Sequence, residues 1–177
     1  MIFLLFLLAT LSSSQHLVKR SRDLQFIDET PPLRLGKQFS RDWKIVKLIT
    51  ESEQATIYKV VNAKHEYAVI KIPGTSISAK RMFATEKRIL NVIKAAADGV
   101  GRQFVLKLLR PVKEHGFEGL LVEYANAGDL FDFVYQRELT QQQIGEIFAK
   151  IVLGVKYLHS IGVVHRDLKP ESNCNCN

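Results

Sequence analysis

The order of β-type and helical segments after residue 42 is the feature that most constrains the fold. Three segments rich in β-branched and aromatic residues follow one another, each bounded by polar or turn-forming residues: "WKIVKLIT" (43–50), "ATIYKVVN" (55–62) and "EYAVIKIP" (66–73). Short connections between such segments are typical of antiparallel pairing. The sequence therefore predicts a three-stranded antiparallel meander.

One amphipathic helix is predicted next, from Ser78 to about Ala96, with Gly99 and Gly101 as its stop signal. Apolar residues recur here at helical spacing. They are Met82, Phe83, Ile89, Leu90 and Ile93.

Two further strands are expected in "FVLKLLRPV" (104–112) and "GLLVEYA" (119–125), followed by a short helix that opens at "GDLFDFV" (128–134). A longer helix is predicted from about Thr140 to His159. Its apolar stripe holds Ile144, Ile147, Phe148, Ile151, Val155 and Leu158. Five strands with one inserted helix, followed by helices, indicate an α+β fold.

Composition and charge favour an ordinary folded protein. The 177 residues are 46% hydrophobic and 24% charged, and the formal net charge is +7. Lys and Arg are scattered among Asp and Glu, so we expect no nucleic-acid partner and, at most, a phosphate-bearing ligand. The two cysteines, Cys174 and Cys176, build no disulfide framework, and a Cys-x-Cys pair alone is a poor metal site.

The amino-terminal residues 1–14 resemble a secretory signal. An apolar run from Ile2 to Leu11 precedes small hydroxyl residues, and the run is too short to span a bilayer, so no transmembrane span is expected. The chain would then enter the secretory pathway or be secreted; if the signal is not used, it would be cytoplasmic. Residues 15–40 mix charges with prolines and are interpreted as a linker or extended arm.

Lys71 and Glu86 are charged residues at positions that are otherwise apolar. Lys71 lies in the third strand among apolar neighbours, and Glu86 lies on the apolar stripe of the helix. Either residue alone would be interpreted as a surface side chain with a buried stem. A charge on a core-facing surface is costly unless it is paired, so we expect the two to form an ion pair.

The order of "YAVIKI", "TEKRIL", "LLVEYANAGDLF" and "YLHSIGVVHRDLKPES" resembles that of the eukaryotic protein kinase domain, and "HRDLKP" carries most of the resemblance. The segments "GDLFDFV" and "GVVHRDLKPE" look most like the corresponding sequences of the calcium/calmodulin-dependent and AMP-activated serine/threonine kinases. A partial kinase domain would occupy residues 41–171, with the small lobe at 41–125 and the start of the large lobe at 126–171. Residues 172–177 would form an irregular tail.

The resemblance implies ATP as cofactor and a protein substrate or protein partner. Lys71 would hold the α- and β-phosphates, and Glu86 would fix that lysine. Asp167 would accept the proton of the substrate hydroxyl. Lys169 would neutralise charge on the transferred phosphoryl group and marks the serine/threonine type.

The adenosine pocket also follows from the resemblance. The backbone of Glu123 and Ala125 would pair with adenine, Val122 would guard the back of the pocket, and Val69 would press on the base. Asp129 would reach the ribose hydroxyls.

The phosphate loop departs from the family pattern, because Thr50, Ser52 and Ala55 stand where three glycines belong. A Cβ at these positions obstructs close approach of backbone N–H groups to phosphates. Glu51 and Glu53 add like charge. The segment is either a weakened nucleotide loop or an ordinary acidic hairpin turn.

The metal ligands of the family are largely missing. Ser172 replaces the Asn expected five residues after Asp167, Asn173 comes one residue late, and no Asp-Phe-Gly triplet follows. Mg²⁺ is expected for the family, but we assign no metal ligand in this chain. The resemblance also predicts that the long helix exposes an apolar patch.

Two functions remain open. The first is an ATP-binding serine/threonine protein kinase, of which this chain is a truncated fragment that is inactive by itself. The second is a pseudokinase-like module that binds a protein partner without catalysis. A further interpretation treats the low-complexity ending "SNCNCN" as not genuine.

Overall fold

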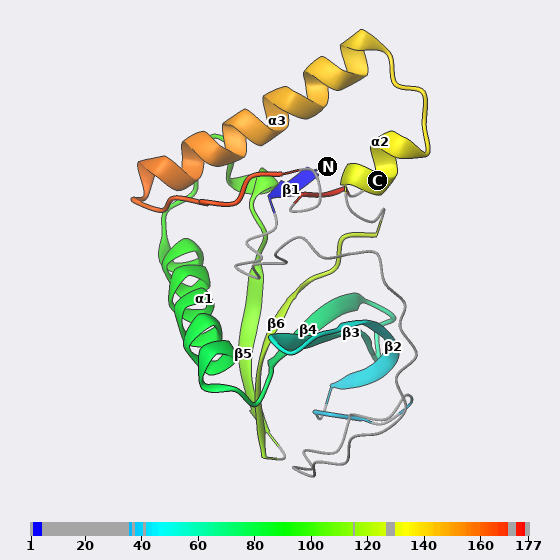
Figure 1. Ribbon diagram of the computed structural model, residues 1–177, viewed down its shortest axis with the longest axis vertical. Coiled ribbons are helices and arrows are strands. Elements are labelled where there is room, and N and C mark those ends of the chain that lie inside the picture. Colours follow the sequence, from blue (N-terminus) through cyan, green and yellow to red (C-terminus); the bar gives the residue numbers. More distant parts are fainter. Residues whose placement is uncertain are drawn as a thin grey trace.

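The computed structural model describes residues 2–4, 36, 38–40, 42–114, 116–126, 130–169 and 173–175 (Figure 1). A five-stranded antiparallel sheet forms the larger part of it, in the order β2-β3-β4-β6-β5. The strands are β2 (Trp43–Glu51), β3 (Ala55–Asn62), β4 (Tyr67–Pro73), β5 (Leu108–Glu114) and β6 (Phe117–Glu123). The predicted meander and the α+β class are confirmed.

The fourth strand begins later than predicted, at Leu108 rather than at Phe104. Arg102–Phe104 form a short 3-10 helix, η1, and Val105 and Leu106 are buried without belonging to a strand. A short apolar run cannot distinguish a strand from another buried segment by its pattern alone. Here the run is buried because it belongs to the same core cluster as Leu158 of the long helix.

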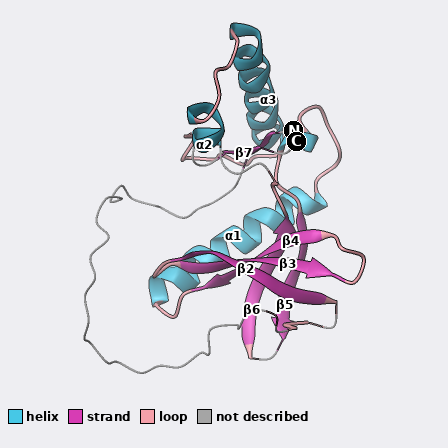
Figure 2. Ribbon diagram, turned by 90° about the vertical axis from the view of Figure 1, so that its right-hand side faces the viewer, coloured by secondary structure: helices cyan, strands magenta, loops and turns pink. Residues whose placement is uncertain are grey.

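Helix α1 (Ile77–Ala95) packs against the sheet, which Figure 2 shows from a second direction. Its N-terminus is capped by Ser76, whose side chain accepts a hydrogen bond from the backbone N–H of Ala79 at 3.1 Å. The inward stripe is buried at Phe83, Leu90 and Ile93, as helical spacing predicted.

The sheet has a core cluster on each of its faces. Leu120 and Val122 of β6 pack with the inward residues of α1, whereas Leu121, between them, packs in a second cluster with Ile45 and Phe39. Phe39 and Ser40 are nearly inaccessible, so the folded lobe includes residues that were assigned to the arm. Residues 15–35 lie outside the described part of the chain.

Helices α2 (Leu130–Tyr135) and α3 (Gln141–Ser160) follow the sheet, as predicted. Thr140 and Gln143 form a capping box at the start of α3, in which each side chain bonds to the other residue's backbone N–H. Only the second half of α3 is buried, where it contacts η1. The first half leaves Ile144 and Phe148 45% and 66% exposed, which matches the expected apolar patch.

A second, small sheet joins β1 (Ile2–Leu4) to β7 (Asn173–Asn175), so both ends of the chain lie together in Figure 1. The irregular tail predicted for 172–177 is therefore wrong at residues 173–175, because their backbone pairs with residues 2–4. The rest of the proposed signal segment lies outside the described residues. No helix in the described part of the chain is long and apolar enough to cross a membrane.

Candidate functional site

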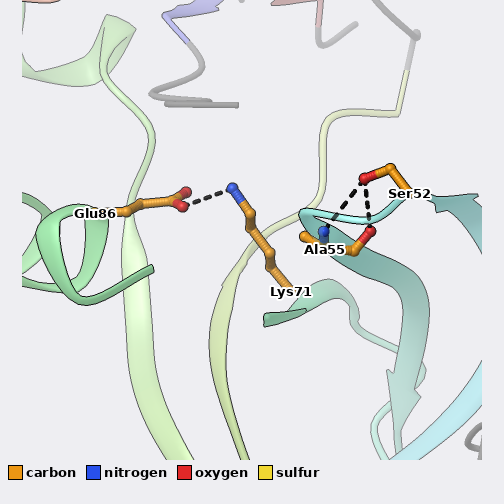
Figure 3. Close-up of polar contacts among 4 residues, drawn as sticks. All are labelled: Ser52, Ala55, Lys71 and Glu86. Atoms are coloured by element: carbon orange, nitrogen blue, oxygen red, sulfur yellow. Dashed lines mark hydrogen bonds and ion pairs between the residues drawn. The ribbon is translucent and has the colours of Figure 1, made fainter. Parts of the chain in front are cut away.

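Lys71 and Glu86 form an ion pair between β4 and α1 (Figure 3). The Nζ atom of Lys71 lies 2.6 Å from Oε2 of Glu86. Lys71 is 7% exposed and Glu86 is 4% exposed, so both charges are removed from water. The ion pair expected from the sequence is present.

Burial and pairing act on Glu86 in opposite directions. Burial raises the pKa of the Glu86 carboxyl above its ordinary value, while the charge of Lys71 and its hydrogen bond lower it. Lys71 therefore compensates part of the cost of a buried carboxylate.

A pocket lies beside this ion pair. Its lining residues include Gln54 and Ala55 at the β2–β3 turn, Lys71 at β4, and Phe83 and Glu86 of α1. The pocket is thus bounded by three elements that are separate in sequence. The cavity measures about 10 Å³, room for about one water molecule, between the ammonium group and the turn.

The β2–β3 turn is a closed hairpin turn. The Oγ atom of Ser52 accepts from the backbone N–H of Ala55 at 3.2 Å and donates to the Ala55 carbonyl at 3.1 Å (Figure 3). The N–H of Ser52 also donates to that carbonyl, at 3.0 Å. Thr50 pairs with Ile57 in the ladder before the turn. The segment is a turn between two paired strands, and both interpretations of it stay open.

Two residues of this region were missed by the sequence analysis. Gln54 projects into the pocket wall, and the backbone N–H of Gly74 donates to its carbonyl oxygen at 2.9 Å. The sequence did offer one indication of this contact. Gly74 directly follows Pro73 at a strand end, and a glycine there can mark a place where another backbone segment approaches closely.

The residues expected around adenine lie in β4, at the end of β6 and just after it. Val69 of β4 is paired directly with Val122 of β6, and Val122 is 7% exposed. Ala125 is half-buried and follows the strand. Asp129 lies outside the described residues. Val69 and Val122, the two residues expected to contact the base through their side chains, are therefore neighbours although more than fifty residues separate them in the sequence.

Glu123 is held at this point by Lys107. Its backbone N–H donates to the Lys107 carbonyl at 3.1 Å, and its Oε1 accepts from the Lys107 N–H at 2.6 Å. Burial raises the pKa of the Glu123 carboxyl, and the hydrogen bond from Lys107 lowers it. Since the N–H of Glu123 is already used, a base could contact this residue's backbone only through its carbonyl.

A cation–aromatic cluster adjoins this connection and was also missed. The Nζ of Lys59 lies 4.0 Å from the ring centroid of Tyr67 and 4.1 Å from that of Tyr124. Tyr124 stands between Glu123 and Ala125, so the cluster ties the connection to β3 and β4. Alternation along β3 and β4 could have placed Lys59 beside Tyr67, but not beside Tyr124.

The loop after α3 carries the other predicted residues. Gly162 has φ +74°, and the N–H groups of Gly162 and Val163 donate to the carbonyls of His159 and Leu158 at 3.0 and 2.9 Å. These two bonds form a Schellman motif, which ends the helix and turns the chain. Val163 is buried beside Leu158, so the start of the loop is anchored in the core.

Asp167 and Lys169 lie together within this loop. The Lys169 Nζ is 3.0 Å from Oδ2 of Asp167, and both side chains are about one-third exposed, at 32% and 39%. His165 is buried, and its Nδ1 accepts from the backbone N–H of Asp167 at 3.3 Å. Arg166 between them has φ +70°. The Asp167 carboxylate and the Lys169 ammonium group are therefore partly exposed to solvent, whereas His165, which bonds to the Asp167 backbone, is buried.

Within the described residues, no group of three or more His, Cys, Asp or Glu is arranged to hold a metal ion. The residue that replaces the expected metal-binding Asn, Ser172, lies outside those residues. No step is assigned to a metal here.

The described features together define a protein kinase. They are the antiparallel sheet, the buried Lys71–Glu86 pair that links it to α1, and "HRDLKP" after the long helix α3. A family model described as a protein kinase domain matches residues 43–173, and this chain belongs to that family. The family predicted from the sequence is confirmed.

The similar curated proteins are serine/threonine kinases. A serine/threonine-protein kinase chk-1 from Caenorhabditis briggsae is 26% identical over 137 residues, which cover 73% of this chain and 26% of that protein. A serine/threonine-protein kinase H1 homolog from Pinctada fucata is 28% identical over 120 residues, covering 64% and 27%. A carbon catabolite-derepressing protein kinase from Secale cereale is 28% identical over 123 residues, covering 66% and 24%. The chain spans about a quarter of the length of these relatives.

Proposed function

We propose that this chain supplies the ATP-binding part of a serine/threonine protein kinase. The observation that carries the proposal is the buried pair of Lys71 and Glu86 beside a pocket, because a lysine fixed by a carboxylate is a preorganised cationic partner for phosphates. The serine/threonine kinases among the relatives support the same assignment.

In this proposal the adenosine group lies against Val69 and Val122, and its phosphates extend toward Lys71. In a complete kinase, a protein hydroxyl would attack the γ-phosphorus, the bond to the β–γ bridging oxygen would break, and ADP would leave. The Asp167 carboxylate would take the hydroxyl proton, and Lys169 would offset negative charge on the transferred group. The solvent exposure of Asp167 and Lys169 is consistent with access by a protein substrate.

The residues present here limit what this stretch does by itself. Ser172 takes the position of a metal-binding Asn, and the 177 residues contain no Asp-Phe-Gly triplet. Since phosphoryl transfer depends on metal electrostatics, we expect this stretch alone to bind ATP without transferring phosphate.

A thermal-shift titration with ATP, with and without Mg²⁺, tests nucleotide binding. The parent chain should be stabilised by ATP, and Lys71→Met should lose the response. Lys64→Ala, at an exposed turn between β3 and β4, is the matched control and should keep it. An equal response of parent and Lys71→Met would place nucleotide elsewhere and overturn the proposal.

The second candidate is a pseudokinase-like module that binds a protein partner. The closed β2–β3 turn favours it, because this turn carries side chains in place of glycines and exposes Glu51 and Glu53. No response to ATP by a folded parent chain, with or without Mg²⁺, would favour this function over the first.

A further inference from the structure

Strands β3 and β4 place Lys59 and Tyr67 on the face of the sheet that holds the two expected base contacts. Lys59 is paired directly with Val69, and Val69 is paired directly with Val122. Tyr67 precedes Val69 by two residues in β4. Residues that are directly paired, or two apart in one strand, have their side chains on the same face. Lys59 and Tyr67 therefore lie beside Val69 on the face where the base is expected.

The ammonium group of Lys59 contacts two tyrosine rings. Its Nζ atom lies 4.0 Å from the ring centroid of Tyr67 and 4.1 Å from that of Tyr124, and the two centroids are 6.1 Å apart. A cation at this distance over a ring is attracted to it. Of these three residues, only Tyr124 belongs to the connection after β6. Lys59 is therefore a noncovalent link between that connection and the strands β3 and β4.

The two rings are the groups that compensate the charge of Lys59. No carboxylate of the described residues forms an ion pair with it. Across the ladder, Lys59 is paired with Lys47 of β2, and like charges opposite each other are unfavourable. Among the described residues, Lys47 makes no contact of this kind with a ring. The two lysines of one cross-strand pair thus differ in that only Lys59 is linked to the connection.

We propose that Lys59 is a positioning residue of the adenine site: it holds Tyr124 and thereby fixes the backbone that pairs with the base. Tyr124 stands between Glu123 and Ala125, the two residues whose backbone is expected to pair with adenine. This inference rests on the proposed function of ATP binding. Its basis is the contact of Lys59 with the ring of Tyr124, together with the place of that ring in the connection.

Conformational entropy gives the direction of the effect. The Glu123 N–H donates to the Lys107 carbonyl at 3.1 Å, and the Lys107 N–H donates to the Glu123 carboxylate at 2.6 Å, so the connection is attached at its start. Lys59 adds an attachment at Tyr124. Without it, Tyr124 and Ala125 could adopt more conformations, and these must be given up when a base binds. The loss of affinity should therefore be limited to ligands that contain the base.

The first test measures the connection without nucleotide. Nitrogen relaxation of the backbone amides gives the order parameters of Tyr124 and Ala125 in solution. Lys59→Met, which keeps an apolar stem, should lower both below the rigid-backbone value of about 0.85. Lys59→Arg should keep them, because it keeps a cation for the rings. Lys47→Met is the matched control and should also keep them. Unchanged order parameters in Lys59→Met would overturn the positioning role.

The second test compares ATP with inorganic tripolyphosphate, which carries phosphates without a base, by calorimetry on the same variants. Lys59→Met should bind ATP about fivefold more weakly than Lys47→Met, which loses the same charge. The two variants should bind tripolyphosphate equally. Lys59→Arg should bind ATP as the parent does. If Lys59→Met loses affinity for ATP and tripolyphosphate to the same extent, Lys59 attracts the phosphates and the positioning role is wrong.

The two tests separate the positioning role from the proposed function. If ATP binds neither the parent nor any variant, ATP binding fails, while the order parameters still decide whether Lys59 holds the connection. If the parent binds ATP but Lys59→Met equals Lys47→Met in order parameters and in affinity, the positioning role is wrong and nucleotide binding stands.

Discussion

The Lys71 Nζ and Glu86 Oε2 atoms lie 2.6 Å apart, between strand β4 and helix α1, and both residues are almost fully buried. Each charge is therefore compensated mainly by the other. Removing one partner leaves the other buried and unpaired, which is more costly than removing both.

The first prediction concerns the stability of variants at this pair. Glu86→Leu alone should lower the free energy of unfolding by about 3–5 kcal/mol, because it leaves the Lys71 ammonium unpaired. The double variant Lys71→Met/Glu86→Leu should recover much of this loss. Urea denaturation of the parent, both single variants and the double variant measures the coupling. Additive losses in this cycle would show that the two charges do not compensate each other.

Lys71 and Glu86 also show what the sequence could predict. Each residue lies at a position where the pattern predicts an apolar side chain. Burying a charge there is costly, and pairing the two charges offsets that cost. Their contact could therefore be predicted from periodicity and energetics. Strands β2, β3, β4 and β6 and the three α-helices followed from the same periodicity. Such features depend on a few neighbours along one element, and those neighbours are visible in the sequence.

Gln54 shows where sequence reasoning stopped. Its buried oxygen depends on how the turn rests on Gly74, twenty residues later, and no periodicity encodes that contact. Likewise, the backbone pairing of β1 with β7 joins residues 2–4 to residues 173–175. Contacts of this kind depend on tertiary placement, and side-chain patterns carry no signal for them.

The second prediction concerns pH and Glu123. Burial raises the folded-state pKa of this carboxyl above the reference value of 4.5. Between the unfolded and folded pKa values, the folded chain binds more protons, so its free energy of unfolding falls as pH rises through that window. Glu123→Gln cannot ionise and keeps an acceptor for the Lys107 N–H.

The stability of Glu123→Gln relative to the parent should therefore increase as pH rises from below 4.5 to above the folded pKa. Unfolding curves collected across this range for both proteins give the difference. A difference that is constant with pH, or that changes in the parent's favour, would contradict the burial assigned to this carboxyl.

The third prediction compares two glycines with left-handed backbone. Gly101 has φ +96° and Gly116 has φ +84°, but only Gly101 is crowded: a Cβ there would lie 2.0 Å from the carbonyl oxygen of Leu153 in α3. Gly116→Ala should cost about 1 kcal/mol, from backbone conformation alone. Gly101→Ala should cost about 2 kcal/mol more, because η1 must also move away from α3. Equal losses in thermal unfolding would mean that η1 and α3 are not in close contact.

The fourth prediction concerns the exposed face of α3. Ile144, Phe148 and Val152 are 45%, 66% and 47% exposed and follow one another at four-residue intervals, so they form a continuous apolar row. Phe148→Ser should reduce self-association of the 177-residue chain in sedimentation velocity at increasing concentration, with little change in stability. Ile77→Ser is the control, because Ile77 is 72% exposed but lies on another helix, α1, away from this row. If Ile77→Ser reduces association as much as Phe148→Ser, exposed apolar area in general, and not the row on α3, drives the association.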